Sequence, residues 1–260
     1  MSNSGLELSV AGAIAQVRLA RPDVRNAFNA ELIAELRAAF ERLGADDSLR
    51  AVVISGDGKT FCGGADINWM RASLELSHED NVADAKRMSD MFRAIDRCPK
   101  PVIARVHGAA LGGGAGLVAV CDVAVAADDT LFGFTETKLG ILPAVISPFV
   151  IAKIGVSHAR ALFLTGERFA ADRAAAIGLV HEVVRLEDLD TAVDRITEEL
   201  KTAGPGAIAL AKKTIADVVA ATYEQTRDIT SQAIAQQRTT EEGQEGLRAF
   251  LERRKPNWTA

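Results

Sequence analysis

Two glycine-rich segments and one isolated acid combine residue types that can stabilise an enolate. The first segment is Cys62-Gly-Gly-Ala-Asp-Ile67 and the second is Gly108-Ala-Ala-Leu-Gly-Gly-Gly114; each follows an apolar run rich in β-branched residues. Glycine lets backbone N–H groups approach a ligand closely, as donors to a developing negative charge must. Glu136 follows in a mostly apolar stretch. Together these features predict an oxyanion hole with a carboxylate beside it, and chemistry on an acyl thioester.

The glycines determine which N–H groups can serve as donors. Gly63 and Gly64 permit backbone conformations that other residues avoid, so the N–H of Ala65 can point into a site, although this segment alone fits an ordinary loop equally well. The second segment begins an apolar helical stretch, where the helix dipole favours negative charge. Phosphate cradling is a poor alternative, because its glycines do not form G-x-G-x-x-G and no Lys-Ser/Thr pair follows.

The remaining polar candidates divide between chemistry and structure. Apolar neighbours are expected to raise the pKa of Glu136 and suit it to general acid and base work, the alternative being a surface glutamate. Asp122 is predicted to be a structural cap or turn former. His107, at a strand end near the proposed site, is predicted to satisfy local hydrogen bonds. None of the four histidines is accompanied by a nearby Ser/Asp or Cys pattern that would indicate a nucleophilic triad or a metal site.

The elements that must position these residues alternate between strand and helix. Residues 6–19 alternate apolar and polar around a turn at Gly12, which predicts an edge hairpin. A helical period over residues 30–43 follows Asn29, a suitable cap. Residues 51–54, 102–106 and 123–126 are short, β-branched strands of the buried type. This alternation predicts an α/β fold.

The character of the chain changes after residue 184. Helical patterns cover residues 186–202, 207–219, 223–238 and 242–253 with no strand between them. We therefore expect a core with the active site over residues 1–184 and a helical region over residues 185–260. These helices carry enough apolar residues to need a partner surface, which predicts an oligomer.

Composition narrows the class of protein. The chain has 260 residues, 48% hydrophobic and 25% charged, with a net charge of -5 and no dense basic patch, which argues against nucleic-acid binding. Its three cysteines lack metal-ligand spacing and are expected to be free thiols in the cytoplasm. The N-terminus shows no signal pattern and no apolar run is long enough for a membrane span, so neither is expected.

The motifs resemble those of the crotonase (enoyl-CoA hydratase/isomerase) superfamily along nearly the whole chain. The similarity runs through segments 21–29, 61–67, 101–104, 108–114, 121–122, 132–140, 164–166, 178–180 and 249–255. It implies a spiral of ββα units followed by a helical trimerisation region, assembled as a homotrimer or a dimer of trimers.

The resemblance also assigns roles to individual residues. It implies that the N–H groups of Ala65 and Gly113 hold the thioester oxygen while Glu136 moves protons. It implies no metal and no separate cofactor, since coenzyme A is part of the substrate. The residues expected to contact the acyl-CoA are Arg25, Ala27, Phe28, Ala65, Asp66, Ile67, Gly113, Phe250 and Arg253, the last two facing the pantetheine or phosphates, from the same or a neighbouring subunit. Trp69, Met70, Leu142, Val145 and Phe149 are expected to line the acyl pocket.

One departure from the family pattern keeps the reaction open. Typical hydratases of this family carry a first glutamate just after the triple glycine, where this chain has Gly116, so only Glu136 remains. A single acid suffices for a Δ3,Δ2-enoyl-CoA isomerase, which is one alternative. Segments 65–70, 136–148 and 164–169 more closely resemble bacterial methylglutaconyl-CoA hydratases of leucine degradation, which favours a hydratase. The third alternative is a non-catalytic acyl-CoA-binding protein.

Overall fold

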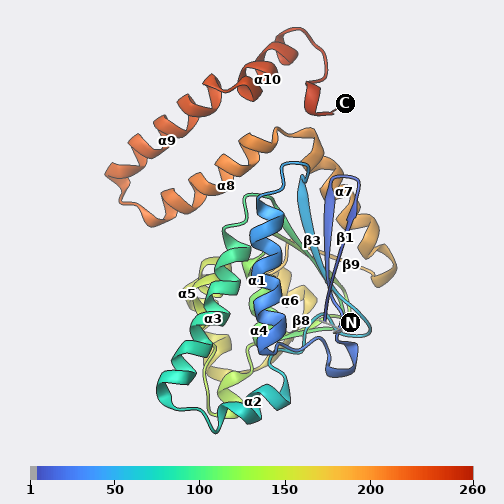
Figure 1. Ribbon diagram of the computed structural model, residues 1–260, viewed down its shortest axis with the longest axis vertical. Coiled ribbons are helices and arrows are strands. Elements are labelled where there is room, and N and C mark those ends of the chain that lie inside the picture. The colour runs from blue at the N-terminus through green and yellow to red at the C-terminus, as the bar shows by residue number, and fades with distance from the viewer. Residues whose placement is uncertain (1–4, 260) are drawn as a thin grey trace.

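The computed structural model describes residues 5–259 and contains two β-sheets, several covering helices and a helical arm (Figure 1). The larger sheet has the order β1-β2-β3-β4-β6-β9 and the smaller one β5-β7-β8. The strands are β1 (Leu6–Ala11), β2 (Ile14–Leu19), β3 (Ala51–Gly56), β4 (Val102–Val106), β5 (Ala109–Leu111), β6 (Val123–Ala127), β7 (Leu131–Gly133), β8 (Arg168–Ala170) and β9 (Glu182–Val184). The predicted α/β class is confirmed. Residues 1–4, which begin the segment expected to contain no signal peptide, lie outside the described residues.

The larger sheet is built as its sequence predicts. β1 and β2 form the expected antiparallel edge hairpin, in which Ala11 pairs with Ile14 around a turn where Gly12 has a φ of 59°. β2, β3, β4, β6 and β9 then run parallel to one another. The β-branched residues of β3 and β4 are buried, as parallel strands covered on both faces require.

Successive turns of the chain alternate between the two sheets. After β4 the chain passes into β5 of the smaller sheet, forms α4 (Gly113–Val120) and returns to the larger sheet as β6. After β6 it passes again into the smaller sheet as β7. This repetition winds the chain into a spiral and brings equivalent points of successive turns side by side.

Helices cover the sheets and close the core. α1 (Ala30–Gly44) begins at Asn29, whose side chain accepts a hydrogen bond from the N–H of Leu32, so the predicted cap is confirmed. α1 lies beside α3 (His78–Asp96), and both bury apolar side chains in one large core cluster. The other helices of this part are α2 (Ile67–Ser73), α5 (Ser147–Thr165) and α6 (Ala171–Ala176).

The C-terminal helices divide into one that packs on the sheet and three that stand away from it. α7 (Leu189–Thr202) buries Leu189, Ala192 and Val193 in a second core cluster. The other three form a hairpin-like arm: α8 (Pro205–Ala220), α9 (Tyr223–Thr239) and α10 (Glu241–Leu251). Figure 1 shows this arm projecting beyond the sheets. We call residues 5–203 the body and α8–α10 the arm.

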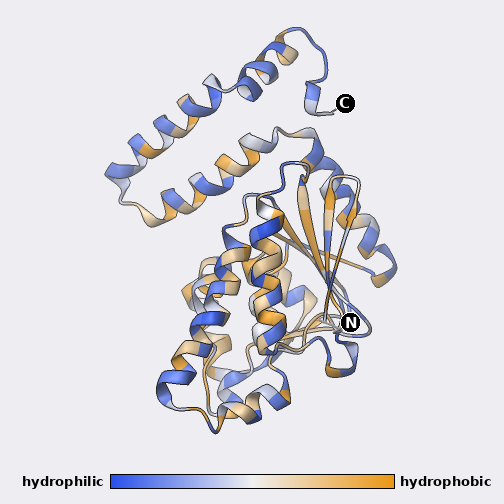
Figure 2. Cartoon of the chain, viewed as in Figure 1, coloured by the Kyte–Doolittle hydropathy of each residue, from blue (hydrophilic) through white to orange (hydrophobic). Residues whose placement is uncertain are grey.

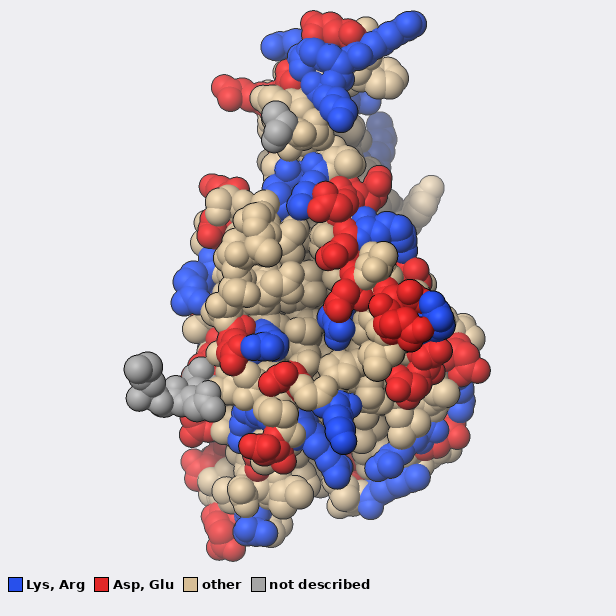
Figure 3. All heavy atoms as spheres, turned by 90° about the vertical axis from the view of Figure 1, so that its right-hand side faces the viewer, with Lys and Arg blue, Asp and Glu red and all other residues tan. Residues whose placement is uncertain are grey.

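The body and arm differ in surface character. In Figure 2 apolar residues concentrate in the strands and inner helix faces of the body, whereas apolar and polar residues alternate along the arm. Figure 3 shows the arm as a narrow projection, with acidic and basic side chains both present on the face of the body below it. Of residues 5–259, none belongs to a helix long and apolar enough to cross a membrane.

Candidate active site

Three parallel segments bring the predicted site residues to one place. Ala110 of β5 pairs with Cys62 on one side and with Phe132 of β7 on the other, both in parallel register. The three segments therefore leave their paired residues close to one another. Three positions on, the first two segments reach Ala65 and Gly113, and the third reaches Thr135, next to Glu136. The spiral thus unites the two glycine segments and the lone acid.

The backbone at Ala65 is oriented by a short parallel bridge to Phe28. The N–H of Phe28 donates to the carbonyl of Gly64 at 2.7 Å, and the N–H of Asp66 donates to the carbonyl of Phe28 at 2.8 Å. In such a bridge the residue between the two bonded groups directs its own N–H to the opposite side. The N–H of Ala65 is therefore turned away from Phe28, which leaves it available to a ligand.

The first segment lies directly against the second one. Gly64 has a φ of 95°, and a Cβ at that position would lie 2.8 Å from the carbonyl oxygen of Leu111 and 3.8 Å from the backbone nitrogen of Gly113. A Cβ on Gly114 would lie 2.3 Å from the carbonyl oxygen of Cys62. Only glycine lets the two backbone segments approach this closely, and the approach places Ala65 near Gly113.

α4 presents its N-terminus at this junction. The preceding residue, Gly112, has a φ of 52° and provides no side-chain cap, and all eight residues of the helix are buried. The first N–H groups of a helix have no partner within it, and the helix dipole adds partial positive charge there. The N–H of Gly113 is thus placed as an oxyanion donor requires.

Glu136 places its carboxylate at the start of α4. A Cβ on Gly112 would lie 3.2 Å from Oε1 of Glu136, and Oε2 is buried with no hydrogen-bond partner in the structure. Burial raises the pKa of Glu136 above its ordinary value, with its own backbone N–H opposing the shift. A buried, unpartnered carboxylate with a raised pKa beside two N–H donors can accept and return a proton.

Ile146 blocks the position where a second acid could stand. A Cβ on Gly116 would lie 2.3 Å from Cγ2 and 2.8 Å from Cβ of Ile146, and 3.4 Å from the ring of Phe92. Contacts this short force a neighbour to move, and here one of the atoms belongs to the branched carbon of a fully packed side chain. The departure at Gly116 is therefore part of the core packing.

The residues expected to bind coenzyme A fall into three groups. Arg25, with a φ of 57°, is exposed, and Ile67 is exposed at the start of α2, so both are accessible beside the site. Ala27 and Phe28 are buried, which leaves only their backbone for a ligand. The last two, Phe250 and Arg253, lie at the end of the arm, which Figure 1 shows far from α2 in the same chain.

The expected acyl-pocket residues also differ in placement. Trp69, Val145 and Phe149 are partly buried and pack against the core, whereas Leu142 is exposed. Met70 lies on α2 and is partly buried. Of the expected pocket residues, Val145 and Phe149 therefore combine a position shortly after Glu136 in the sequence with packing against the core.

Asp66 has a structural role that the sequence did not reveal. Its carboxylate accepts from the N–H of Asn68 as the cap of α2 and pairs with the guanidinium of Arg21 at 2.8 Å. Arg21 also donates to the carbonyl of Ala27, so it spans both sides of the Phe28 bridge. Desolvation would raise the pKa of the Asp66 carboxyl, but these hydrogen bonds and Arg21 hold it lowered. Arg21 lies in segment 21–29, which contributed to the family resemblance, but that resemblance gave it no role.

Two further interpretations concern structural residues. Asp122 accepts from the N–H of Val102 at 2.7 Å, so it links the chain after α4 to β4. Its role is structural, as predicted, but it bonds a strand rather than capping a helix or forming a turn. His107 lies within 2.9 Å of the carbonyl of Gly58 through Nε2, which fits local hydrogen bonding, while its Nδ1 has no partner. All three cysteines are free, as expected, and all three are buried. No three potential metal ligands of the His, Cys, Asp and Glu types gather anywhere in residues 5–259.

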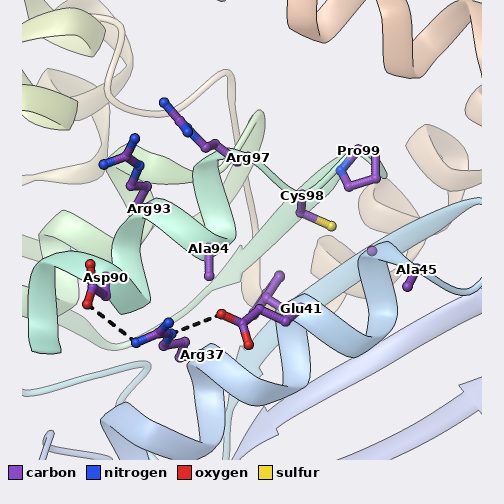
Figure 4. Close-up of a pocket in the computed structure, with 11 residues that line it drawn as sticks. Arg37, Glu41, Ala45, Asp90, Arg93, Ala94, Arg97, Cys98 and Pro99 are labelled. Carbon is purple, nitrogen blue, oxygen red and sulfur yellow. Dashed lines mark hydrogen bonds and ion pairs between the residues drawn. The ribbon is translucent and has the colours of Figure 1, made fainter.

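A separate cavity of about 510 Å³ lies between α1 and α3 (Figure 4). Its wall includes Arg37, which pairs with Glu41 and Asp90, and also Arg93 and Arg97. None of its lining residues belongs to the glycine segments or to the chain around Glu136. The cavity is thus distinct from the candidate active site.

Comparisons with known proteins agree with this geometry. The crotonyl-CoA hydratase of Syntrophomonas wolfei is 32% identical over 94% of this chain and 94% of its own length. The short-chain-enoyl-CoA hydratase of Clostridium acetobutylicum is 30% identical over 98% of this chain and 97% of its own. A crystal structure of an enoyl-CoA hydratase from Shewanella pealeana superposes with a TM-score of 0.94 at 37% identity, covering 98% and 96%.

The match extends to the family as a whole. Residues 9–260 match the family model described as enoyl-CoA hydratase/isomerase. The spiral of strands and the C-terminal helices are those of the crotonase fold. This chain therefore belongs to the enoyl-CoA hydratase/isomerase family.

Proposed function

We propose that this protein is an enoyl-CoA hydratase, a hydro-lyase that adds water across the 2,3 double bond of an acyl-CoA thioester. The observation that carries the proposal is the Glu136 carboxylate, whose Oε2 has no partner and whose Oε1 lies beside Gly112 at the start of α4. The relatives described as enoyl-CoA hydratases support the same reaction.

The reaction follows from the arrangement of donors and acid. The N–H groups of Ala65 and Gly113 hold the thioester oxygen and stabilise the enolate that forms when water adds to C3. Glu136 takes one proton from that water and returns it to C2, so one molecule of water is added and the acid is restored. The proposed chemistry uses no metal and no redox cofactor, and coenzyme A enters and leaves as part of the substrate.

A second candidate is a Δ3,Δ2-enoyl-CoA isomerase, and one observation favours it. Ile146 occupies the space beside Gly116, and the nearby acid Asp66 is engaged with Arg21, so Glu136 is the acid left to move protons. One carboxylate suffices to take a proton from C2 and deliver it to C4. The same oxyanion donors would stabilise the dienolate between those steps.

We further propose a branched glutaconyl-CoA, such as 3-methylglutaconyl-CoA, as the acyl substrate. The proposal depends on the similarity of segments 65–70, 136–148 and 164–169 to hydratases of that class. The apolar Val145 and Phe149, which follow Glu136, suit the methyl branch. The relatives named above instead act on crotonyl-CoA and short-chain enoyl-CoAs by their names, which makes crotonyl-CoA the natural competitor.

For the arm we propose self-association as a homotrimer or a dimer of trimers, through the region 185–260. The supporting observation is that α8 and α9 contain no buried residue, while Ile215, Val219 and Phe250 are exposed. A second copy of the chain would cover these side chains. It could also bring Phe250 and Arg253 to a neighbour's coenzyme A site.

Ultraviolet absorbance of the conjugated thioester tests the proposed reaction and its acyl substrate. Three substrates are compared in parallel: 3-methylglutaconyl-CoA, crotonyl-CoA and a 3-enoyl-CoA. Loss of the band with 3-methylglutaconyl-CoA and crotonyl-CoA is expected for a hydratase, and their relative kcat/KM gives the acyl preference. Appearance of the band with a 3-enoyl-CoA alone would replace the hydratase by the isomerase. Tight binding of all three with no spectral change would indicate a non-catalytic acyl-CoA-binding protein.

A further inference from the structure

The far end of α4 is held by a lysine outside the proposed active site. Lys153, on α5, donates from Nζ to the carbonyl of Cys121 at 2.7 Å and to the carbonyl of Asp122 at 3.2 Å. These two residues directly follow the last residue of α4. The ammonium group therefore binds the chain where α4 ends, while the N–H of Gly113 lies where it begins.

α4 has little of its own to keep it in place. Three of its eight residues are glycine, which has the poorest helix propensity after proline, and its N-terminus carries no side-chain cap. All eight residues are buried, so no surface side chain anchors it through ion pairs. Its end is secured instead through the two residues that follow it. Lys153 binds both of their carbonyl groups, Sγ of Cys121 donates to the carbonyl of Leu117, and Asp122 is bonded to Val102 of β4.

Lys153 is itself fixed in the body. It lies in the first part of α5, which buries Val150 and Ile154 and breaks at Gly155, where φ is 74° and ψ is 163°. Burial lowers the pKa of Lys153, while neighbouring Cys121 and Asp122 oppose that shift. The carboxylate of Asp122 is bound elsewhere, to Lys212 of α8 at 2.6 Å and to the N–H of Val102. The carbonyl contacts are thus the bonds that Lys153 itself makes here.

We propose that Lys153 is a positioning residue for the oxyanion hole: by binding the carbonyl groups of Cys121 and Asp122 it fixes α4, and with it the Gly113 N–H donor. This inference builds on the proposed function, because the donor must hold a thioester oxygen. The positive charge of Lys153 also stabilises the oxyanion, since a cation at the far end of a helix about 12 Å long favours an anion at the near end. Oxyanion donors contribute most when they are fixed before the reaction.

The test combines kinetics with a measurement that needs no turnover. Lys153→Met is expected to lower kcat about tenfold and to leave KM within about twofold, because the coenzyme A contacts are untouched. Amide hydrogen exchange in residues 113–120 of the substrate-free protein is expected to quicken. Lys153→Arg keeps the charge and the donors and should recover most of kcat. Lys86→Met is the matched control, since Lys86 is an exposed lysine on α3 of the body.

Several outcomes would overturn the proposal. Unchanged kcat and unchanged exchange in a folded Lys153→Met variant would show that α4 needs no such anchor. If that variant does not fold, Lys153→Gln replaces the ammonium by a neutral amide on a side chain one atom shorter, which loses the charged contact to both carbonyl groups. A wild-type kcat together with wild-type exchange in that variant would count equally against the proposal. If the wild-type protein turns over none of the enoyl-CoAs, the proposed function fails, whereas the exchange comparison still decides whether Lys153 anchors α4.

Discussion

α4 in the body and α9 in the arm are opposite kinds of helix. Every residue of α4 is buried and none is charged, whereas α9 buries none of its seventeen residues. α4 is positioned entirely by contacts within its own chain, including the packing of Gly114 on Cys62. The arm, in contrast, exposes side chains such as Val219, which is 78% exposed. The difference fits our proposals that the body holds the acid and the oxyanion donors and that the arm serves association.

The largest effect should come from the acid in the body. Glu136→Gln removes the proton carrier but keeps the shape of the side chain, so we expect hydration to fall about a thousandfold. Assembly, measured by light scattering, should be unchanged. Glu224→Gln, on exposed α9, is the matched control and should retain full turnover. Substantial residual hydration in Glu136→Gln would remove Glu136 from its proposed role.

The next effect concerns packing inside the body. Gly116→Ala places a methyl group within 2.3 Å of Ile146, so we expect it to lower the free energy of unfolding by about 1–3 kcal/mol. Ile146→Ala leaves a cavity and should destabilise by about 2–5 kcal/mol alone. In the double variant the two changes should partly compensate, which urea denaturation of all four proteins would measure. Strict additivity would contradict the contact described here.

In the arm the expected effect is on association. Val219→Asp places a charge on the exposed apolar side of α8, and we expect the dissociation constant of the assembly to rise at least about tenfold. Sedimentation across a concentration series would measure it. Val10→Asp, on the exposed edge strand β1, is the matched control. If both variants remain assembled, the arm does not carry the main interface.

The smallest effect is a pH-dependent change in stability. Because burial raises the pKa of Glu136, its charged form destabilises the folded state. The penalty is absent well below the ordinary value of 4.5, grows as pH rises from that value to the folded pKa, and stays constant above it. Glu136→Gln carries no charge at any pH. Its Tm should therefore exceed that of the wild type by roughly 2 °C at pH 7 and match it near pH 4. Equal differences at both pH values would argue against a burial effect.

Local signals in the sequence were sufficient for most of the elements. The turn at Gly12 and the cap at Asn29 act within a few residues, so their patterns predict structure directly. The packing of Ile146 on Gly116 joins residues thirty positions apart, and no local pattern specifies it. The pairing of Arg21 with Asp66 is equally remote. The site roles of Ala65, Gly113 and Glu136 came from glycine spacing and family resemblance, and they stay predictions.

The burial of Cys62 affects how readily an enoyl-CoA can modify its thiol. Enoyl thioesters are electrophiles that alkylate thiolates, and Cys62 lies three residues before the proposed donor Ala65. Burial raises the pKa of Cys62 to about 12, so at pH 7 only roughly one thiol in 10⁵ is ionised. Its Sγ also donates to the carbonyl of Asn26. We expect mass spectrometry after prolonged turnover to find Cys62 unmodified; an adduct there would mean that the first glycine segment opens during catalysis.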